Sequence, residues 1–286
     1  MTDITEPEKS PYTVLSVERE GHVATLFLDR PEKRNAMGMP FFAELPEAMA
    51  ELGRDRDIRA IVVAAKGPHF SVGLDLSTLA DVGNPGSGSG SNGAPSAAEI
   101  GRRTHADVLR LQAAISSAAD CPKPVIAAVH GYCIGGAVDL ITSCDIRVCA
   151  ADAIFSVRET KMAIVADIGS LARLPLVLSM GQVAELVYTG RDIDAERAAQ
   201  IGLVNHVFDD ADAAVAGARA IAAEIAANSP VAVEGSKAVL SQVHRAQVDA
   251  AQRYVAAWNA GQLRSHDLTE AVTAFFERRP PEFKGR

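Results

Sequence analysis

"PVIAAVHGYCIGGAVDLITSCDIRVCA", residues 124–150, is the stretch that decides the fold class. Its first part, residues 124–129, is a short apolar run with three β-branched residues, which is typical of a buried strand. A glycine pair follows, and residues 136–144 then form an apolar segment with the length of a short helix. "DIRVCA", residues 145–150, predicts the next strand. A strand, a helix and a strand in this order indicate a parallel sheet covered by helices, and so an α/β protein.

The residues before this stretch predict a β-β-α-β opening. "TVLSVE" and "VATLFL", residues 13–18 and 23–28, flank a polar turn and predict a hairpin. Apolar side chains at helical spacing predict a helix over residues 41–52, and "AIVVAA", residues 60–65, predicts a buried strand. A further helix is expected to end near Cys121.

The residues after Gly169 are mainly helical. We expect one helix over residues 170–180 that ends at Gly181, and Ala-rich helices that fill residues 211–263. The apolar stripe of the last helices is expected at Val248, Val255 and Trp258.

Two features suggest how the chain is divided. A soft boundary near residue 205 is predicted between an α/β core, residues 1–205, and a helical C-terminal part, residues 206–286, for oligomerisation and closure of the site. "GNPGSGSGSNGAP", residues 83–95, has too little apolar surface to offset its ordering entropy, and we expect a mobile loop there.

The composition is that of a globular protein. The 286 residues are 48% hydrophobic and 22% charged, and their net charge is −8, which argues against a nucleic-acid or membrane-surface binder. The four cysteines form no C-x-x-C pair, so neither a zinc site nor a disulfide framework is indicated. Since no apolar targeting segment begins the chain, we expect a cytoplasmic protein.

Two glycine turns are candidates for chemistry. "GYCIGGAVDL", residues 131–140, places Gly135 and Gly136 at the start of a helix, where free N–H groups and the helix dipole favour an anion. "GPHFSVGLDLS", residues 67–77, places Gly73 in a turn after a strand, so that the N–H of Leu74 can point into a cleft. Tight packing alone would also explain the glycines.

Together these motifs resemble a known family. "GPHFSVGLDL", then "AAVHGYCIGGAVDLITSCDIR" and "FSVRETKMAIVADIGSLARLP", are similar to sequences of the enoyl-CoA hydratase/isomerase (crotonase) superfamily. The resemblance covers nearly the whole chain and implies a crotonase-like ββα spiral core with a helical C-terminal part. It also implies an acyl-CoA thioester whose carbonyl oxygen is bound by the backbone N–H groups of Leu74 and Gly136. Such donors stabilise the enolate formed when a proton beside the thioester is removed.

Three acidic residues point to one subgroup. The chain resembles the 3,5-dienoyl to 2,4-dienoyl-CoA isomerases of fatty acid β-oxidation at three positions. These are Asp139, Glu159 and Asp167, in "GGAVDL", "VRE" and "VAD". The resemblance implies that Glu159 is the base at C2 and Asp167 the acid at C6. Asp139 would tune Glu159, because neighbouring carboxylates and burial raise the pKa of a carboxyl group.

Each acid has a structural alternative. Asp167 precedes a predicted helix and would serve as its N-cap. Glu159 lies between Arg158 and Lys161 and would be a solvated surface charge. Asp139 would be structural if it paired with Arg147 or His130. The alternative functions are a 2-enoyl-CoA hydratase and a non-catalytic acyl-CoA-binding protein.

The resemblance also implies partners and contacts. Coenzyme A is part of the substrate, so no separate cofactor and no metal is expected, and the chain is expected to form a homotrimer or homohexamer. No contact with nucleic acid or membrane is expected. The residues expected to contact the substrate or its CoA moiety are Lys33, Arg34, Ala36, Gly73, Asp75, Leu76, Ser77 and Gly135.

Overall fold

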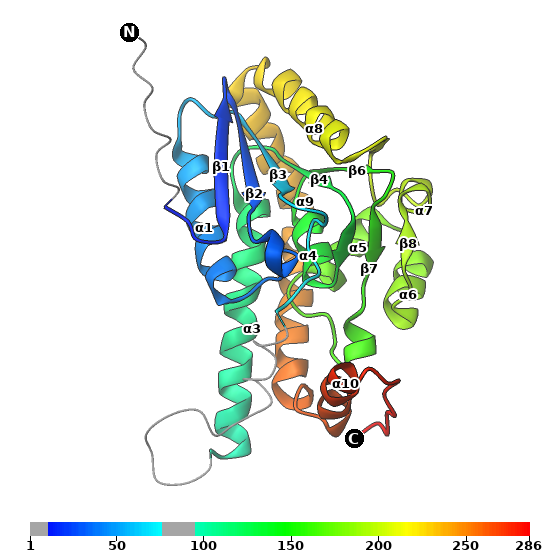
Figure 1. The fold of residues 1–286 in the computed structure, drawn as a ribbon. Helices are drawn as coiled ribbons and strands as arrows, with labels where there is room; N and C mark the ends of the chain where they lie inside the picture. Colours follow the sequence, from blue (N-terminus) through cyan, green and yellow to red (C-terminus); the bar gives the residue numbers. More distant parts are fainter. Residues whose placement is uncertain (1–10, 76–94) are drawn as a thin grey trace.

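The main sheet has six strands, most of them parallel. The computed structural model describes residues 11–75 and 95–286. The strand order is β1-β2-β3-β4-β6-β9, in which only the β1–β2 hairpin is antiparallel (Figure 1). The predicted hairpin and the buried strands are confirmed. The bounds are β1 (Leu15–Glu20), β2 (Val23–Leu28), β3 (Ala60–Ala65), β4 (Val125–Val129), β6 (Ile146–Ala150) and β9 (His206–Phe208).

A second, smaller sheet branches from the first. Its order is β5-β7-β8, with β5 and β7 parallel and β7 and β8 antiparallel. β5 begins three residues after β4 ends, and its last residue precedes the glycine turn that opens the next helix. The strands are β5 (Tyr132–Ile134), β7 (Ile154–Ser156) and β8 (Ile193–Asp194).

Helices cover both faces of the main sheet. α8 (Ala211–Ala226) packs on one face, against Val62 and Ile126. Because successive side chains of a strand point to opposite faces, Ile61 and Val63 belong to the core on the other face. The helices of that second face are α1 (Met39–Arg54), α3 (Ala97–Asp120) and α4 (Gly136–Ser143).

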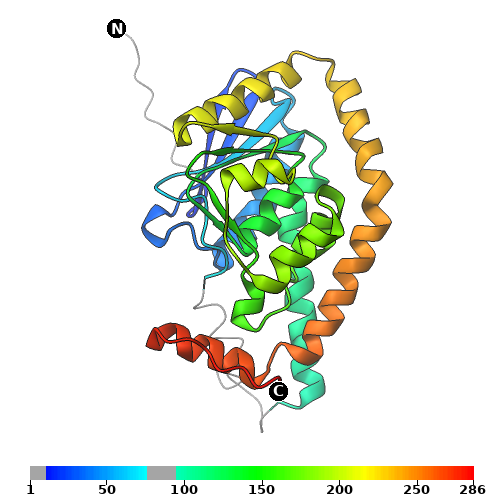
Figure 2. The ribbon, with the colours of Figure 1, turned by 90° about the vertical axis from the view of Figure 1, so that its right-hand side faces the viewer.

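The longest helix runs along the outside of the core. α9 (Pro230–Gln262) lies beside α3, and α10 (His266–Glu277) leads away sideways from the lower end of α9 (Figure 2). None of the helices in the described ranges is long and apolar enough to span a membrane. The remaining elements are η1 (Pro31–Lys33), η2 (Glu159–Met162), α5 (Ser170–Val177), α6 (Met180–Thr189) and α7 (Ala195–Gln200).

Two helix predictions need correction. The helix expected over residues 170–180 ends at Val177, because Leu178 is extended, and α6 then begins, so Gly181 lies inside a helix. The predicted stripe on α9 is only partly buried: Val255 is buried, whereas Trp258 is 49% exposed. The buried face of α9 is largely polar and includes Asn259.

The chain on either side of residue 205 is connected through the main sheet. β9 pairs with β6, and α8 packs against the same sheet. The division into residues 1–205 and 206–286 stays a prediction. The expected loop at residues 83–95 lies outside the described residues, except for Pro95.

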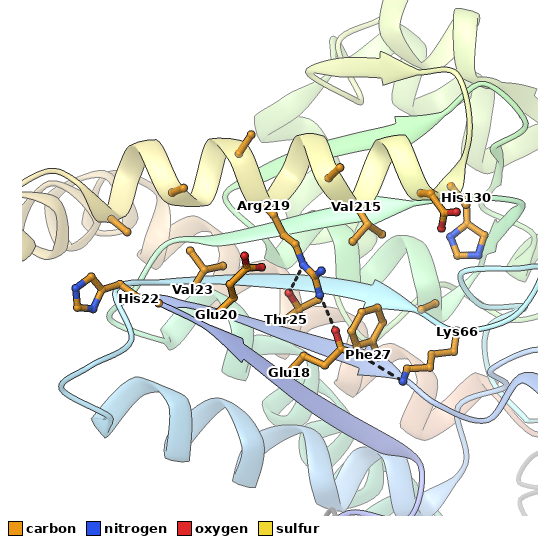
Figure 3. A pocket seen from close by; sticks show the side chains of 18 of the residues that line it. Glu18, Glu20, His22, Val23, Thr25, Phe27, Lys66, His130, Val215 and Arg219 are labelled. Carbon is orange, nitrogen blue, oxygen red and sulfur yellow. Dashed lines mark hydrogen bonds and ion pairs between the residues drawn. The ribbon is translucent and has the colours of Figure 1, made fainter. Parts of the chain in front are cut away.

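A hollow of about 1170 Å³ lies between α8 and the β1–β2 hairpin (Figure 3). Arg219 reaches across it from α8, where Nε donates to Thr25 Oγ1 (2.9 Å) and Nη2 pairs with Glu18 Oε2 (2.8 Å). The residues predicted for the active site are not among those that line this hollow. The chemistry predicted from the sequence therefore has to be sought on the other side of the sheet.

Candidate active site

A smaller pocket contains the predicted catalytic residues. Its volume is about 130 Å³, and it lies where the turn after β3, the β5–α4 turn and the segment from η2 to α5 meet. Both predicted oxyanion residues and all three predicted acids line it. Its lining residues are Val72, Gly73, Leu74, Leu111, Ile134, Gly135, Gly136, Asp139, Arg158, Glu159, Met162, Ile164, Asp167 and Ile168.

The two glycine turns pack against each other. Gly73 has a φ of +84°, and a Cβ on it would lie 2.5 Å from the carbonyl oxygen of Ile134, so only glycine fits there. A Cβ on Gly136 would lie 3.7 Å from the backbone nitrogen of Leu74. The predicted pair of donors is therefore brought to one place.

Neither donor is engaged within the described part of the chain. Gly136 is the first residue of α4, where a backbone N–H has no acceptor within its own helix. Leu74 and Met37 form an isolated β-bridge. In this bridge the N–H of Met37 donates to the carbonyl oxygen of Gly73 and the N–H of Asp75 donates to that of Met37, so the N–H of Leu74 takes no part. Within residues 11–75 and 95–286, neither N–H has an acceptor, so the two are available to a ligand oxygen.

Glu159 begins the 3-10 turn η2 and points into the site. Its Oε1 lies 3.3 Å from where a Cβ on Gly135 would stand, and its Oε2 is buried without a hydrogen-bond partner in the described part of the chain. The guanidinium of Arg158 pairs with Asp192 (2.5 Å) rather than with Glu159. Glu159 is therefore neither a solvated charge nor half of an ion pair with its neighbour.

Asp139 lies in α4 and is 1% exposed. One of its oxygens accepts a hydrogen bond from the backbone N–H of Ser170, at the first turn of α5. Arg147, the suggested structural partner, donates instead to backbone oxygens, including that of Leu203 (2.8 Å). The other oxygen of Asp139 has no partner among the described residues, so the alternative of a structural pair with Arg147 or His130 is wrong.

Asp167 is held from a distant helix. Its Oδ2 accepts a hydrogen bond from Asn259 Nδ2 on α9 (2.7 Å), and its backbone oxygen accepts one from Gln112 Nε2 on α3 (2.6 Å). The N-cap of α5 is Gly169, and the first backbone N–H of the helix, that of Ser170, donates to Asp139 rather than to Asp167. The alternative in which Asp167 caps the helix is therefore wrong.

Burial raises the pKa of all three acids. The pKa of Glu159 rises to about 8 through burial and then through the charges of Asp139 and Asp167. That of Asp139 rises to about 7 through burial, although the hydrogen bonds from Ser170 oppose this. That of Asp167 rises to about 6 through burial, and Asn259 opposes this. The site is thus able to retain a proton at neutral pH.

The residues predicted for CoA contacts are partly outside this pocket. Gly73 and Gly135 line it, but Lys33 and Arg34 are exposed and Ala36 is half-buried on the η1 loop. Asp75 pairs with Arg30 (3.3 Å). The structure does not describe Leu76 and Ser77, so those two predictions lie outside the described residues.

Sequence reasoning missed the residues that support the site. Asn35 is buried and connects the η1 loop to the segment after β3, since its Nδ2 donates to the carbonyl oxygens of Lys66 and His69, both at 2.9 Å. Asn259 supports Asp167. It is the last residue of "YVAAWN", and an amide one helical turn after Val255 and Ala256 is the signal that would have revealed it.

Comparison with known proteins extends this picture. The sequence profile described as enoyl-CoA hydratase/isomerase matches residues 18–286. A similar relative is the peroxisomal Delta(3,5)-Delta(2,4)-dienoyl-CoA isomerase of Arabidopsis thaliana, 40% identical over 95% of this chain and 97% of the relative. Another is the mitochondrial Delta(3,5)-Delta(2,4)-dienoyl-CoA isomerase of Mus musculus, 42% identical over 90% of this chain and 77% of the relative.

These names correct one prediction. A cytoplasmic location was expected because no targeting segment was recognised. The relatives are named peroxisomal or mitochondrial, which contradicts that expectation. The absence of a recognisable address was too weak an observation to assign a compartment.

A solved structure supports the fold. The enoyl-CoA hydratase/isomerase of Pseudoalteromonas atlantica T6c is 31% identical, covers 95% of this chain and all of its own, and superposes with a TM-score of 0.80. The predicted crotonase-like α/β fold is confirmed. With a matching profile over most of its length, the chain belongs to the enoyl-CoA hydratase/isomerase family.

Proposed function

We propose that this protein is an enzyme of fatty acid β-oxidation that converts 3,5-dienoyl-CoA to 2,4-dienoyl-CoA. One observation carries the proposal: Asp139, Glu159 and Asp167 line a single pocket. Leu74 and Gly136 line it too, and their backbone N–H groups have no acceptor among the described residues. The relatives named dienoyl-CoA isomerase support the same reaction. A simple enolate site would need fewer buried acids.

The reaction moves two double bonds toward the thioester. Glu159 takes a proton from C2, and the electron pair of that C–H bond spreads over the diene and onto the thioester oxygen. The N–H groups of Leu74 and Gly136 stabilise this oxygen, each by about 3 to 4 kcal/mol. Asp167 then delivers a proton to C6, so that one C–H bond breaks, another forms and no net proton is gained.

The electrostatics of the pocket suit this cycle. One acid must be charged and another neutral at the start, and burial keeps a proton among the three at neutral pH. Asp139 faces the same pocket and raises the pKa of Glu159. We assign to Asp139 the tuning of the base rather than a proton transfer of its own.

Exposed residues suggest where the CoA part of the substrate binds. Lys33 and Arg34 are exposed cations on the η1 loop, suited to CoA phosphates, and no cofactor besides the substrate's own CoA is proposed.

We propose a homotrimer or homohexamer, because α9 and α10 expose apolar side chains that a neighbouring subunit would cover. These are Val231, Val239, Leu240, Val243, Tyr254, Trp258, Phe275 and Phe276.

A spectrophotometric assay tests the function. With 3,5-octadienoyl-CoA, the ultraviolet absorbance of a conjugated 2,4-dienoyl thioester should grow with enzyme concentration. With crotonyl-CoA, absorbance should fall slowly or not at all. Rapid hydration of crotonyl-CoA with no diene product would favour the hydratase alternative and overturn the proposal.

Asp167→Asn separates the two activities further. The variant should abolish isomerisation, since its amide cannot deliver a proton, while the affinity for the CoA ester stays within about threefold because the oxyanion donors remain. Binding is measured by titration calorimetry with a saturated acyl-CoA. If the variant isomerised at the wild-type rate, Asp167 would not be the acid.

A further inference from the structure

Asn259 is a buried amide that reaches the active site from outside the motifs. It lies on α9 and is 2% exposed. Its Nδ2 donates to two oxygens, Asp167 Oδ2 at 2.7 Å and the carbonyl oxygen of Val165 at 3.0 Å. Both contacts are on the segment that carries the proposed acid.

The two contacts fix the orientation of the amide. The carbonyl oxygen of Val165 can only accept a hydrogen bond, so the group of Asn259 that faces it must be the NH2. The same NH2 meets Asp167 Oδ2, and that oxygen must therefore accept as well. A proton on the neutral form of Asp167 is consequently carried by the other oxygen, Oδ1.

The amide also affects the strength of the acid. A donor stabilises the charged carboxylate more than the neutral carboxyl, because the hydrogen bond to a charged group is the stronger one. The pKa of Asp167 is accordingly raised less than that of Glu159, whose Oε2 has no partner in the described ranges. Asp167 is thus the acid whose charged form is supported once its proton has left.

We propose that Asn259 is a positioning residue that places the transferable proton of Asp167 on Oδ1 and stabilises the carboxylate left after delivery. The inference rests on the proposed function, since it assumes that Asp167 protonates the far end of the diene. Gln112 holds the same segment through the backbone oxygen of Asp167. Gln112 cannot affect which carboxylate oxygen carries the proton, so it provides a comparison.

The test separates proton removal from proton delivery. The reaction is run in heavy water. If Glu159 removes the C2 proton and a solvent deuteron returns to C2, the recovered 3,5-dienoyl-CoA is labelled. If a proton is delivered at C6 instead, product forms. Asn259→Leu and Asn259→Ala should lower kcat about 10- to 100-fold with KM within about threefold. The ratio of C2 labelling to product formation should rise, since the dienolate forms but is protonated slowly at C6.

The pH profile gives a second readout. Without the amide, the pKa of Asp167 rises. The rate falls at high pH because the acid is deprotonated there, so this alkaline limb of the profile should move to higher pH by about one unit. Gln112→Leu should lower kcat without moving that limb or the labelling ratio. Gln247→Ala, which removes an exposed amide from α9, should match the wild type.

The outcomes are distinct. If Asn259 only holds the fold, its variants will lose C2 labelling and product formation in equal proportion, with an unmoved pH profile, and the inference is overturned. If the wild type itself forms no 2,4-dienoyl-CoA, the proposed function fails rather than the role of Asn259. Circular dichroism on each variant accompanies the kinetics, and a raised ratio in either folded Asn259 variant supports the inference.

Discussion

Asp139, on α4, accepts a hydrogen bond from the backbone N–H of Ser170 at the first turn of α5. Its Oδ2 is buried without a partner in the part of the chain that the structure describes. Ser170 favours the charged form of Asp139, whereas burial and the charge of Asp167 disfavour it. Protonation of any one acid in this pocket therefore affects the pKa of the others.

Asp139→Asn should make Glu159 a weaker base that stays charged at lower pH. The charge of Asp139 is, after burial, the largest cause of the raised pKa of Glu159, and asparagine still offers Ser170 an acceptor oxygen. The rate falls when the pH drops below the pKa of the base, because the base is then protonated. The acidic limb of the kcat/KM profile should therefore move to lower pH by about one unit. Asp107→Asn, at an exposed position on α3, is the control, and an unmoved limb would contradict the tuning role.

Gly136→Ala should damage catalysis more than folding. The added Cβ would lie 3.4 Å from Met37 Sδ and 3.7 Å from the nitrogen of Leu74, so it fits but stands beside the second proposed oxyanion donor. We expect kcat to fall about 10²- to 10³-fold. Gly181→Ala on α6, where a Cβ meets nothing within 4 Å, should keep full activity. Equal activity of the two variants would mean that the thioester oxygen is bound elsewhere.

Glu159→Gln should stabilise the protein at high pH. The pKa of Glu159 is about 8 in the folded state against 4.5 ordinarily, so the folded state holds this proton more tightly. The unfolding free energy of the wild type therefore falls as pH rises from about 4.5 to 8, a loss that glutamine avoids. Urea titrations should give the variant an advantage of about 2 kcal/mol at pH 8 that shrinks toward pH 5.

The matched control for that comparison is Glu224→Gln on α8, where the carboxylate is exposed. Its stability should follow the wild type at both pH values. A Glu159→Gln variant that is less stable than the wild type at pH 8 would show that the carboxylate is held by stabilising contacts.

Lys237→Met should destabilise the fold without changing the chemistry. Lys237 on α9 is 7% exposed, and its Nζ pairs with Asp145 Oδ2 (2.7 Å) and donates to the backbone oxygen of Lys123 (2.9 Å). Removing it leaves the backbone oxygen of Lys123 without its donor and breaks the ion pair of Asp145, whose Oδ2 keeps the N–H of Val125. We expect a cost of about 1 to 3 kcal/mol in unfolding free energy. Chemical denaturation measures this, with exposed Lys161→Met as control; equal stability of the two variants would refute it.

The fold was largely predictable because its signals are local. The apolar runs of β3 and β4 and the glycine turn before α4 are short stretches whose pattern alone indicates their structure. The break between α5 and α6 was missed, because it depends on an extended Leu178 that no glycine or proline marks. The compartment was missed as well, since an absent signal is weak evidence.

The site was predictable as a set of residues but not as a set of contacts. The motifs located Leu74, Gly136 and the three acids. Asn259 lies 92 residues after Asp167, and only the packing of α9 brings them together. Arg158 is the opposite case, because it adjoins Glu159 in sequence but pairs with Asp192. Hydrogen-bond partners of this kind are set by tertiary packing, which local patterns do not encode.

The length of α9 matters when related gene sequences are judged complete or truncated. Lys237 anchors this helix near one end, and Asn259, about 33 Å further along at the rise of an α-helix, supports the acid. A shortened reading frame that stops before α9 would keep every motif residue from Leu74 to Asp167. Motif searches would accept its product as complete, although Asp167, the proposed proton donor, would have lost its support.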